Sequence, residues 1–425
     1  MSNIYMTELV EHVNFALLIL FSCCYAYQLV YLIVGLVKKD RPEDKPVTDH
    51  RFAVLIPARN EEAVIAGLLG SIRGQTYPSD LIDVYVIADN CTDSTAAMAV
   101  ANGAKVITRF NRRQVGKGYA LDYAFQTIDR QVGLEHYDAF LVFDADNVLD
   151  PGYFAAMNRT FSQGYDMLTS YRNSKNYDTN WISAGYALWF LRESRFLNGA
   201  RMKLGTSCAI SGTGFLVSTR MIREDGGWKY NLLTEDIEFS TDHIIRGYKI
   251  GYCKDAVLYD EQPVTFKASW NQRMRWTKGF YQVFAHYGKG LLKGIAHRSF
   301  QCYDMLMVIA PATLITLASL LFNAVFVLIG LGVGSAATVA AAALSLGGCL
   351  GSVYFTLFLF GAVTLITEQK QIHCPVKRQI RFLFSFPVFI FTYIPMAVVA
   401  LKKNVTWKHI PHSVLCTPEQ ICSKK

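Results

Sequence analysis

The chain has 425 residues, 52% of them hydrophobic and 18% charged, with a formal net charge of +8 at pH 7. This length accommodates a catalytic domain together with membrane helices, and the hydrophobic share is high for a soluble protein. No basic–aromatic module accompanies the positive charge, which argues against a nucleic-acid partner. The ten cysteines form no C-x-x-C pair, so neither a zinc site nor a disulfide framework is indicated.

A long apolar segment opens the chain. Val13 to Val37 contains no charged residue. As a helix it would extend about 37 Å, which exceeds the roughly 30 Å thickness of a bilayer core. A cleaved signal peptide would be shorter and would follow a basic residue. We therefore expect residues 1–37 to form a retained transmembrane anchor.

Further apolar segments follow in the C-terminal part, where we expect a transmembrane region over residues 300–401. Met305 to Thr367 has no charged residue and is long enough for two spans, with a turn of small residues around Gly330–Ser335. A third run, Phe382 to Leu401, contains two prolines. It is either a third span or a bent helix at the membrane interface.

The Lys and Arg residues beside these segments predict their orientation. Residues 1–12 contain none, and the first segment is followed by four, namely Lys38, Lys39, Arg41 and Lys45. The N-terminus is then outside, and residues 38–299 form the cytoplasmic domain of a multi-pass protein of the cell (plasma) membrane. The basic tail, residues 402–425, falls outside if three C-terminal segments cross. Either the third segment does not cross fully, or the tail is exported.

Within the cytoplasmic domain, strand-like and helix-like segments alternate, as in a parallel sheet covered by helices on both faces. The expected strands are Phe52–Ile56, Leu81–Ala88, Lys105–Thr108 and Ala139–Phe143. In such sheets ligands bind beyond the carboxyl ends of the strands. Three polar residues fall at such ends, namely Asn60, Asp89 and Asp144.

Asp144-Ala145-Asp146 places two carboxylates on one side of an extended segment, directly after an apolar strand. A hard divalent cation binds such carboxylates together with substrate phosphates, and it offsets charge on a departing nucleoside diphosphate. An ordinary solvated turn is the alternative. The position after a buried strand favours the metal site.

Thr234-Glu235-Asp236 fits the start of a helix, with Thr234 as the N-cap and two carboxylates in the first turn. Asp236 also suits a general base that takes the proton of an acceptor hydroxyl. Both interpretations can hold together. The helix N-terminus would lower the pKa of Asp236 and keep this residue ionised at pH 7.

Gln272, Arg275 and Trp276 share one helical face. The segment Trp270–His286 mixes aromatic and basic residues, as an interfacial helix does. The functional alternative is that Arg275 neutralises a diphosphate and that a sugar ring stacks on Trp276.

Two glycine-containing turns are weaker candidates, and each has an ordinary turn as its alternative. Gly116-Lys117-Gly118 offers a flexible backbone and a cation for phosphate. Ser211 to Gly214, which includes Gly212 and Thr213, is a loop that a ring can approach closely.

The order of P-A-R-N-E (57–61), D-A-D, T-E-D and Q-R-M-R-W (272–276) resembles membrane-bound family 2 glycosyltransferases. That group includes cellulose, chitin, hyaluronan and poly-N-acetylglucosamine synthases. The resemblance covers Arg51–Tyr287 and implies an α/β domain of the GT-A (Rossmann-like) type beside α-helical transmembrane segments. It also implies inversion at the anomeric carbon, a nucleotide-sugar donor (usually UDP) and Mg²⁺ or Mn²⁺.

The resemblance also implies roles for individual residues. Asp146 would hold the metal with Asp144, and Asp236 would be the base, with Glu235 beside it. The remaining expected residues bind the nucleotide sugar (Asn60, Glu61, Asp89, Lys117 and Asp144) or line the acceptor and diphosphate site (Gln272, Arg275, Trp276, Gly212 and Thr213). The family's usual D-D-G-S reads Ala88-Asp89-Asn90-Cys91 here. The membrane part is also small beside that of synthases that form their own channel.

Three functions compete on this basis. The first is an inverting hexosyl- or N-acetylhexosaminyltransferase that extends a polysaccharide or oligosaccharide in the membrane. The second is transfer of one sugar to a lipid acceptor. The third is a catalytically silent scaffold or export partner, and the joint presence of Asp146 and Asp236 argues against it.

Overall fold

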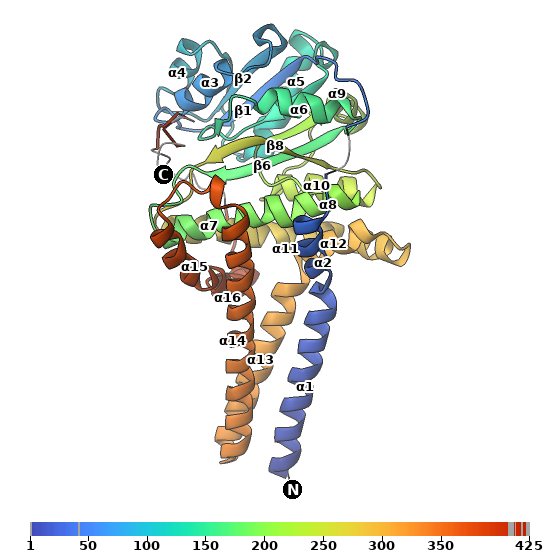
Figure 1. The fold of residues 1–425 in the computed structure, drawn as a ribbon, viewed down its shortest axis with the longest axis vertical. Coiled ribbons are helices and arrows are strands. Elements are labelled where there is room, and N and C mark those ends of the chain that lie inside the picture. The colour runs from blue at the N-terminus through green and yellow to red at the C-terminus, as the bar shows by residue number, and fades with distance from the viewer. Residues whose placement is uncertain (1, 41–42, 407–411, 413, 418–419, 422–425) are drawn as a thin grey trace.

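The computed structural model describes residues 2–40, 43–406, 412, 414–417 and 420–421. Three layers follow one another along its long axis (Figure 1). A domain built on a β-sheet lies at one end, a layer of helices crosses the middle, and three long helices project from that layer. Parts of the expected basic tail, among them residues 407–411, lie outside the described residues.

The sheet has eight strands in the order β3-β2-β1-β4-β7-β6-β8-β5. The four strands β1 to β4 are parallel, as predicted, while β7 and β5 run antiparallel to their neighbours. The strand bounds are β1 Phe52–Ala58, β2 Ile82–Asp89, β3 Lys105–Arg109, β4 Ala139–Val142, β5 Val148–Leu149, β6 Met167–Ser174, β7 Phe215–Ser218 and β8 Gly251–Asp260.

Helices cover both faces of this sheet because its central strands carry apolar side chains on both sides. Leu55 and Phe140 belong to one buried cluster with residues of α5, and Val54 and Leu141 belong to the other with residues of α3 and α6. The helices of this domain are α3 Ile65–Arg73, α4 Thr95–Ala101, α5 Lys117–Gln131, α6 Tyr153–Ser162, α9 Thr219–Glu224 and α10 Glu235–Ile245.

The middle layer contains the long helix α11 and a helix with a π-helical turn in its centre. Its helices are α7 Trp181–Arg192, the π-turn Glu193–Asn198, α8 Gly199–Leu204, α11 Phe266–Ala296 and α12 Phe300–Ile309. Side chains cap the N-termini of the two main helices. Asn180 accepts hydrogen bonds from the first-turn amides of α7, and Thr265 accepts one from Ala268 N–H in α11.

The N-terminal apolar run forms two consecutive helices, α1 Ser2–Tyr25 and α2 Tyr27–Val37, and the segment Ile4–Val37 is long and apolar enough to cross a membrane. Only α1 belongs to the projecting bundle; α2 packs on α8 and the π-turn. The hydroxyls of Tyr27 and Tyr31 donate to Asp304, which also forms a buried ion pair with Arg201 at 2.7 Å. These polar contacts hold α2 in the middle layer.

The projecting bundle consists of α1, α13 Pro311–Gly332 and α14 Ala336–Thr367. The turn between α13 and α14 falls at residues 333–335, as the sequence predicted. The side-chain amides of Asn14 and Asn323 exchange two hydrogen bonds of 3.0 and 2.8 Å, and Asn323 is fully buried. These bonds join α1 to α13, and α14 packs on both helices.

The proline-bearing run forms α15 Val376–Phe391 and α16 Tyr393–Lys402, which lie along the middle layer. Arg273 of α11 donates to the carbonyl of Phe389 and to the hydroxyl of Thr392, where the helix is interrupted. Four helical regions of the described chain are long and apolar enough to cross a membrane, and this is one of them. Helix α15 packs on α7 and α16 packs on α11, and the choice between a third span and an interfacial helix stays a prediction.

Candidate active site

The expected residues Asn60, Asp89 and Asp144 lie at or just beyond the carboxyl ends of β1, β2 and β4. Lys117 lies at their centre. Its ammonium donates to Oδ1 of Asp144 at 2.5 Å and to the carbonyl of Gly212 at 2.7 Å. The glycine after it is required by packing, because a Cβ at Gly118 would lie 2.0 Å from the carbonyl oxygen of Tyr230. Lys117, the first residue of α5, therefore lies beside Asp144, and its contact with a phosphate stays a prediction.

Hydrogen bonds from residues distant in sequence fix both carboxylate residues of the D-A-D turn. Asp144 N–H donates to the Thr213 hydroxyl at 2.9 Å, and that hydroxyl donates to Asn147. Asp146 is buried and accepts from Glu261 N–H at 2.9 Å. Burial alone would raise its pKa, but cations that include His412 and Lys175 hold the pKa of Asp146 below its usual value. Asp146 is therefore ionised at neutral pH.

Asp144 and Asp146 are chemically suited to a hard divalent cation, because both offer carboxylate oxygens. In the described part of the chain, no three His, Cys, Asp or Glu side chains are placed so that they could hold one ion. Mg²⁺ commonly binds through one or two carboxylates plus waters and substrate phosphates. The residues present fit an ion that is shared with a diphosphate.

A residue that the sequence did not reveal comes from the C-terminal tail. His412 Nδ1 lies 3.1 Å from a Glu61 carboxylate oxygen, and its Nε2 lies 4.0 Å from Asp146. Burial opposes the charged imidazole, but the two carboxylates raise the pKa of His412 to about 10. The tail is also bound at Val414, whose N–H donates to Glu261. His412 and Glu61 lie far apart in the sequence, so no local sequence pattern could have predicted this contact.

Helix α10 begins at Glu235, so Glu235 and Asp236 lie in its first turn as predicted. Thr234 occupies the N-cap position, but its buried hydroxyl makes no hydrogen bond to any described residue. It packs against α11 at Gly279, where a Cβ would lie 2.5 Å from that hydroxyl. Thr234 therefore sets the approach of α10 to α11.

The expectation of a lowered pKa at Asp236 is wrong. Backbone amides at the helix N-terminus do favour the ionised form, but burial of the group outweighs them and raises the pKa of Asp236. Burial and the neighbouring Asp236 charge likewise raise the pKa of Glu235. The sequence does not show how deeply a carboxylate is enclosed, and the exclusion of water decides the direction of the shift here.

Gly212 brings the two carboxylate motifs together. It has a φ of +80°, and a Cβ there would lie 3.8 Å from Asp236 Oδ2 and 3.9 Å from Arg172 Nη1. Its carbonyl accepts from Lys117, which also binds Asp144. Lys117 and Gly212 thus join the D-A-D turn to the start of α10.

The Q-R-M-R-W residues line the same region from α11. Arg275 donates to the carbonyl of Leu233 at 2.7 Å, which anchors the segment before T-E-D. The Trp276 ring packs edge-on against Tyr186 and Phe190 of α7, with centroids 5.8 and 6.3 Å apart. Gln272 has a buried Oε1 that accepts no hydrogen bond within the described chain. Trp276 thus lies in an aromatic cluster that reaches the cavity, instead of projecting freely from the surface of α11.

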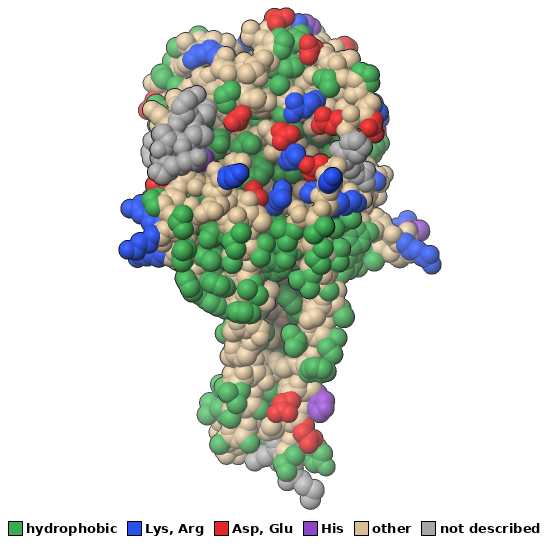
Figure 2. Space-filling view, viewed as in Figure 1, with side chains coloured by type: hydrophobic (Ala, Val, Ile, Leu, Met, Phe, Trp, Pro, Cys, Tyr) green, Lys and Arg blue, Asp and Glu red, His purple; other side chains and the backbone are tan. Residues whose placement is uncertain are grey.

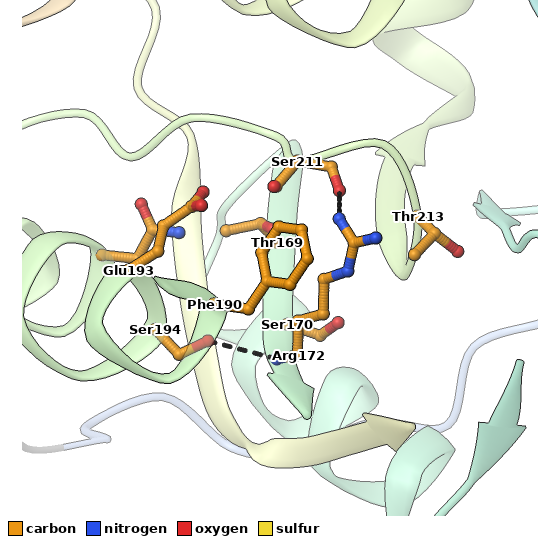
Figure 3. Close-up of a pocket in the computed structure, with 9 residues that line it drawn as sticks. Thr169, Ser170, Arg172, Phe190, Glu193, Ser194, Ser211 and Thr213 are labelled. Carbon is orange, nitrogen blue, oxygen red and sulfur yellow. Dashed lines mark hydrogen bonds between the residues drawn. The ribbon is translucent and has the colours of Figure 1, made fainter. Parts of the chain in front are cut away.

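A small cavity lies between β6, the π-turn and the loop that contains Ser211 (Figure 3). Arg172 extends along it, donates to Asp260 at 2.7 Å and to the Ser211 carbonyl at 2.8 Å, and stacks on Phe190 at 3.7 Å. Glu193 lines the cavity from the π-turn. These residues were missed because their roles depend on a sheet edge and a helix that are distant in sequence.

Two further expected residues make local contacts. Asn60, with a φ of +57°, accepts from Thr92 N–H at 2.8 Å and so holds the loop after β2. Asp89 forms a buried ion pair with Arg109 at 2.6 Å. A direct contact of either residue with a nucleotide stays a prediction.

The chain is similar in sequence and fold to known glycosyltransferases. The sequence profile of "Glycosyltransferase like family 2" matches residues 50–279. A probable glycosyltransferase of Bacillus subtilis, YdaM, is 27% identical over 54% of this chain and 55% of its own length. A beta-monoglucosyldiacylglycerol synthase of Synechocystis is 27% identical over 56% of this chain and 49% of its own length.

Two other similar proteins extend the comparison. A poly-beta-1,6-N-acetyl-D-glucosamine synthase of Staphylococcus epidermidis is 23% identical over 60% of this chain and 64% of its own length. The chain thus spans about half to two thirds of these curated relatives. In fold it is similar to a mannosyltransferase of Pyrobaculum calidifontis solved with GDP-Man and Mn²⁺, with a TM-score of 0.52, 16% identity and coverage of 92% of this chain and 99% of that one. The matched domain and its GT-A fold lead to one conclusion: the chain belongs to glycosyltransferase family 2.

Proposed function

We propose that the chain is an inverting glycosyltransferase that transfers a sugar from a nucleoside-diphosphate sugar, with UDP as the expected nucleotide, to a hydroxyl acceptor at a membrane. The observation that carries this proposal is the convergence at Gly212. Lys117 connects this glycine to Asp144, and Asp236 lies beside the same glycine. Groups suited to a leaving diphosphate and to an attacking hydroxyl are therefore neighbours.

On the donor side, Asp144 and Asp146 would hold Mg²⁺ or Mn²⁺, which would offset the charge of the departing diphosphate. Lys117 and Arg275 add positive charge around the same position. Asn60, Glu61 and Asp89 lie at or just beyond strand ends, where nucleotides bind in α/β sheets, and we assign them to the nucleotide sugar.

On the acceptor side, Asp236 takes the proton from the acceptor hydroxyl as its oxygen bonds to the anomeric carbon. The bond from that carbon to the diphosphate oxygen breaks, and the electron pair leaves with the nucleoside diphosphate. Attack from the face opposite the leaving group inverts the configuration. Trp276 would support the acceptor sugar or headgroup by stacking, because its ring reaches the aromatic residues that line the cavity.

We further propose that α1, α13 and α14 cross the membrane and that α15 and α16 lie along the face next to the catalytic domain. With this arrangement, the described part of the tail lies on the same side of the membrane as the catalytic domain. His412 and Val414 bind the tail to that domain. This arrangement would agree with the Lys and Arg count if the third segment does not cross. The Lys and Arg distribution supports a cytoplasmic catalytic domain.

The acceptor is either a growing saccharide or a membrane lipid, and the bundle favours the lipid. Asn14 and Asn323 bond to each other where α1 and α13 meet, and α14 packs on both helices. From these contacts we infer that the bundle leaves no passage for a growing glycan between α1, α13 and α14. A lipid acceptor needs no such passage, because it can remain in the bilayer while its headgroup reaches Asp236.

The test is product analysis with purified protein in lipid nanodiscs and a panel of labelled nucleotide sugars. We expect a labelled glycolipid that the Asp236→Asn variant does not make. A labelled polymer would favour the saccharide acceptor. The complete absence of labelled product with every donor, despite folded and inserted protein, would contradict the proposed function.

A further inference from the structure

The helix α15 carries an exposed basic patch that the proposed reaction does not use. The patch consists of Lys377, Arg378 and Arg381, all exposed. None of the three makes an ion pair or a side-chain hydrogen bond with any residue that the structure describes. Figure 2 shows Lys and Arg side chains gathered at the left end of the apolar band, where α15 lies in Figure 1.

The protein itself offers these cations little compensation. The sequence has no acidic residue between Glu368 and Glu419, so no counter-ion is close in sequence. The first turn of α15 also has no acidic residue, and its positive helix end disfavours Lys377 and Arg378 there. In the described residues no acidic side chain forms an ion pair with these three cations, so an external anion would lessen their mutual repulsion.

The same helix presents an apolar stripe next to the patch. Val376, Ile380, Phe384 and Val388 recur every four residues and are about half exposed, between 47 and 54%. The opposite face is buried against α7 and α14, with Leu383 and Phe386 almost fully covered. The exposed stripe faces an apolar medium if the bundle crosses a membrane, and the basic patch then lies at the level of the lipid headgroups.

We propose that this basic patch binds the headgroups of anionic phospholipids in the leaflet next to the catalytic domain. The combination of three cations with an adjacent apolar stripe matches a phosphate-bearing headgroup with its acyl chains. A free phosphate would use only the cations. The inference depends on the membrane placement proposed above and is independent of which sugar or acceptor the enzyme uses.

The test measures binding of fluorescent phosphatidylglycerol and fluorescent phosphatidylcholine to the full chain in neutral detergent. We expect a clear preference for phosphatidylglycerol that decreases with added salt. The Lys377→Gln, Arg378→Gln, Arg381→Gln triple variant should lose roughly a hundredfold in affinity for the anionic lipid, because each cation near a membrane surface contributes about fivefold.

Two control variants show whether the positive charge of the patch itself binds the lipid. The charge-preserving triple variant Lys377→Arg, Arg378→Lys, Arg381→Lys should keep the preference, and Arg130→Gln on α5 should not change it. Asp236→Asn should lose transfer and keep lipid binding, so a failure of the proposed reaction leaves this test intact. Equal binding of the two lipids by the unaltered chain would overturn the proposal, and so would full retention in the glutamine triple variant. If that variant does not fold in detergent, the salt titration of the unaltered chain still decides, because anionic-lipid binding that salt does not weaken would overturn the proposal.

Discussion

The ammonium of Lys117 lies 2.5 Å from Oδ1 of Asp144, and this contact joins the G-K-G turn to the D-A-D turn. Lys117 is largely buried, while the Asp144 side chain is 41% exposed. The Asp144 carboxylate therefore stays accessible to a ligand while it binds Lys117. Such a charge-assisted bond contributes about 1.5–3 kcal/mol, so its loss should be measurable.

The Lys117→Met variant should bind the nucleotide-sugar donor roughly tenfold to a hundredfold more weakly, because a cation next to the expected diphosphate is removed. Isothermal titration with a non-hydrolysable donor measures the effect. Lys117→Arg should recover part of the affinity, and Lys105→Met is the matched control, since Lys105 pairs with Asp83 in a mostly exposed position. Unchanged donor affinity in Lys117→Met would remove Lys117 from the site.

Divalent metal ions should be required for transfer, and Asp146→Asn should abolish it. The buried Asp146 carboxylate is held ionised by neighbouring cations, so the neutral amide removes a charge that nothing nearby replaces. Transfer and Mn²⁺ titration should be measured on the same preparation, with the exposed Asp129→Asn as control. Full activity in excess chelator would contradict the metal assignment.

Asp236→Asn should lower transfer about 10²- to 10⁴-fold and leave donor affinity unchanged, because a general base acts only on the acceptor. Single-turnover rates and donor titration separate the two effects. Equal loss of both would instead indicate that Asp236 supports the structure of α10.

The rate of sugar transfer should also rise with pH. Burial raises the pKa of Asp236 and that of Glu235, so both carboxyls stay protonated to higher pH than usual, and a base works only when deprotonated. Glu235→Gln removes a negative neighbour, which makes ionisation of Asp236 easier and should shift the rising limb to lower pH. A pH–rate profile of the two proteins checks the direction; a shift to higher pH would refute the argument.

Trp276→Phe should transfer poorly to the acceptor yet still hydrolyse the donor, because the stacking area for the acceptor shrinks while the D-A-D turn is unchanged. Both products should be measured from one preparation and normalised to inserted protein. Trp189→Phe is the matched control, as Trp189 is partly buried in the same aromatic cluster. A parallel loss of both activities in Trp276→Phe would make it a structural residue.

Single cysteines on a cysteine-free background test the membrane arrangement. Cysteines at Arg130 on the catalytic domain and at Thr406 after α16 should both be protected from an impermeant reagent in intact cells, and a cysteine at Ser2 should react. Both protected positions should become reactive after permeabilisation. Labelling at Thr406 in intact cells would mean that the C-terminal run crosses the membrane after all.

Local sequence patterns were enough to predict much of the fold. The first four strands were predicted because fully apolar segments between polar turns have few alternatives to a buried strand. The α13–α14 turn followed from small residues between two long apolar runs. Asp144, Asp236 and Lys117 were chosen as candidates because carboxylates and a glycine-flanked lysine stand directly after strands or at a helix start, and their roles stay predictions.

Only the tertiary structure decided the rest, because these features depend on contacts between distant segments or on exclusion of water. The contact of His412 with Glu61 spans most of the chain, and Arg172 reaches Asp260 and Phe190 from a neighbouring strand and a helix. The raised pKa of Asp236 follows from enclosure, which outweighs the helix amides. The course of α15 and α16 along the middle layer was decided by bonds from Arg273 that hydropathy does not encode.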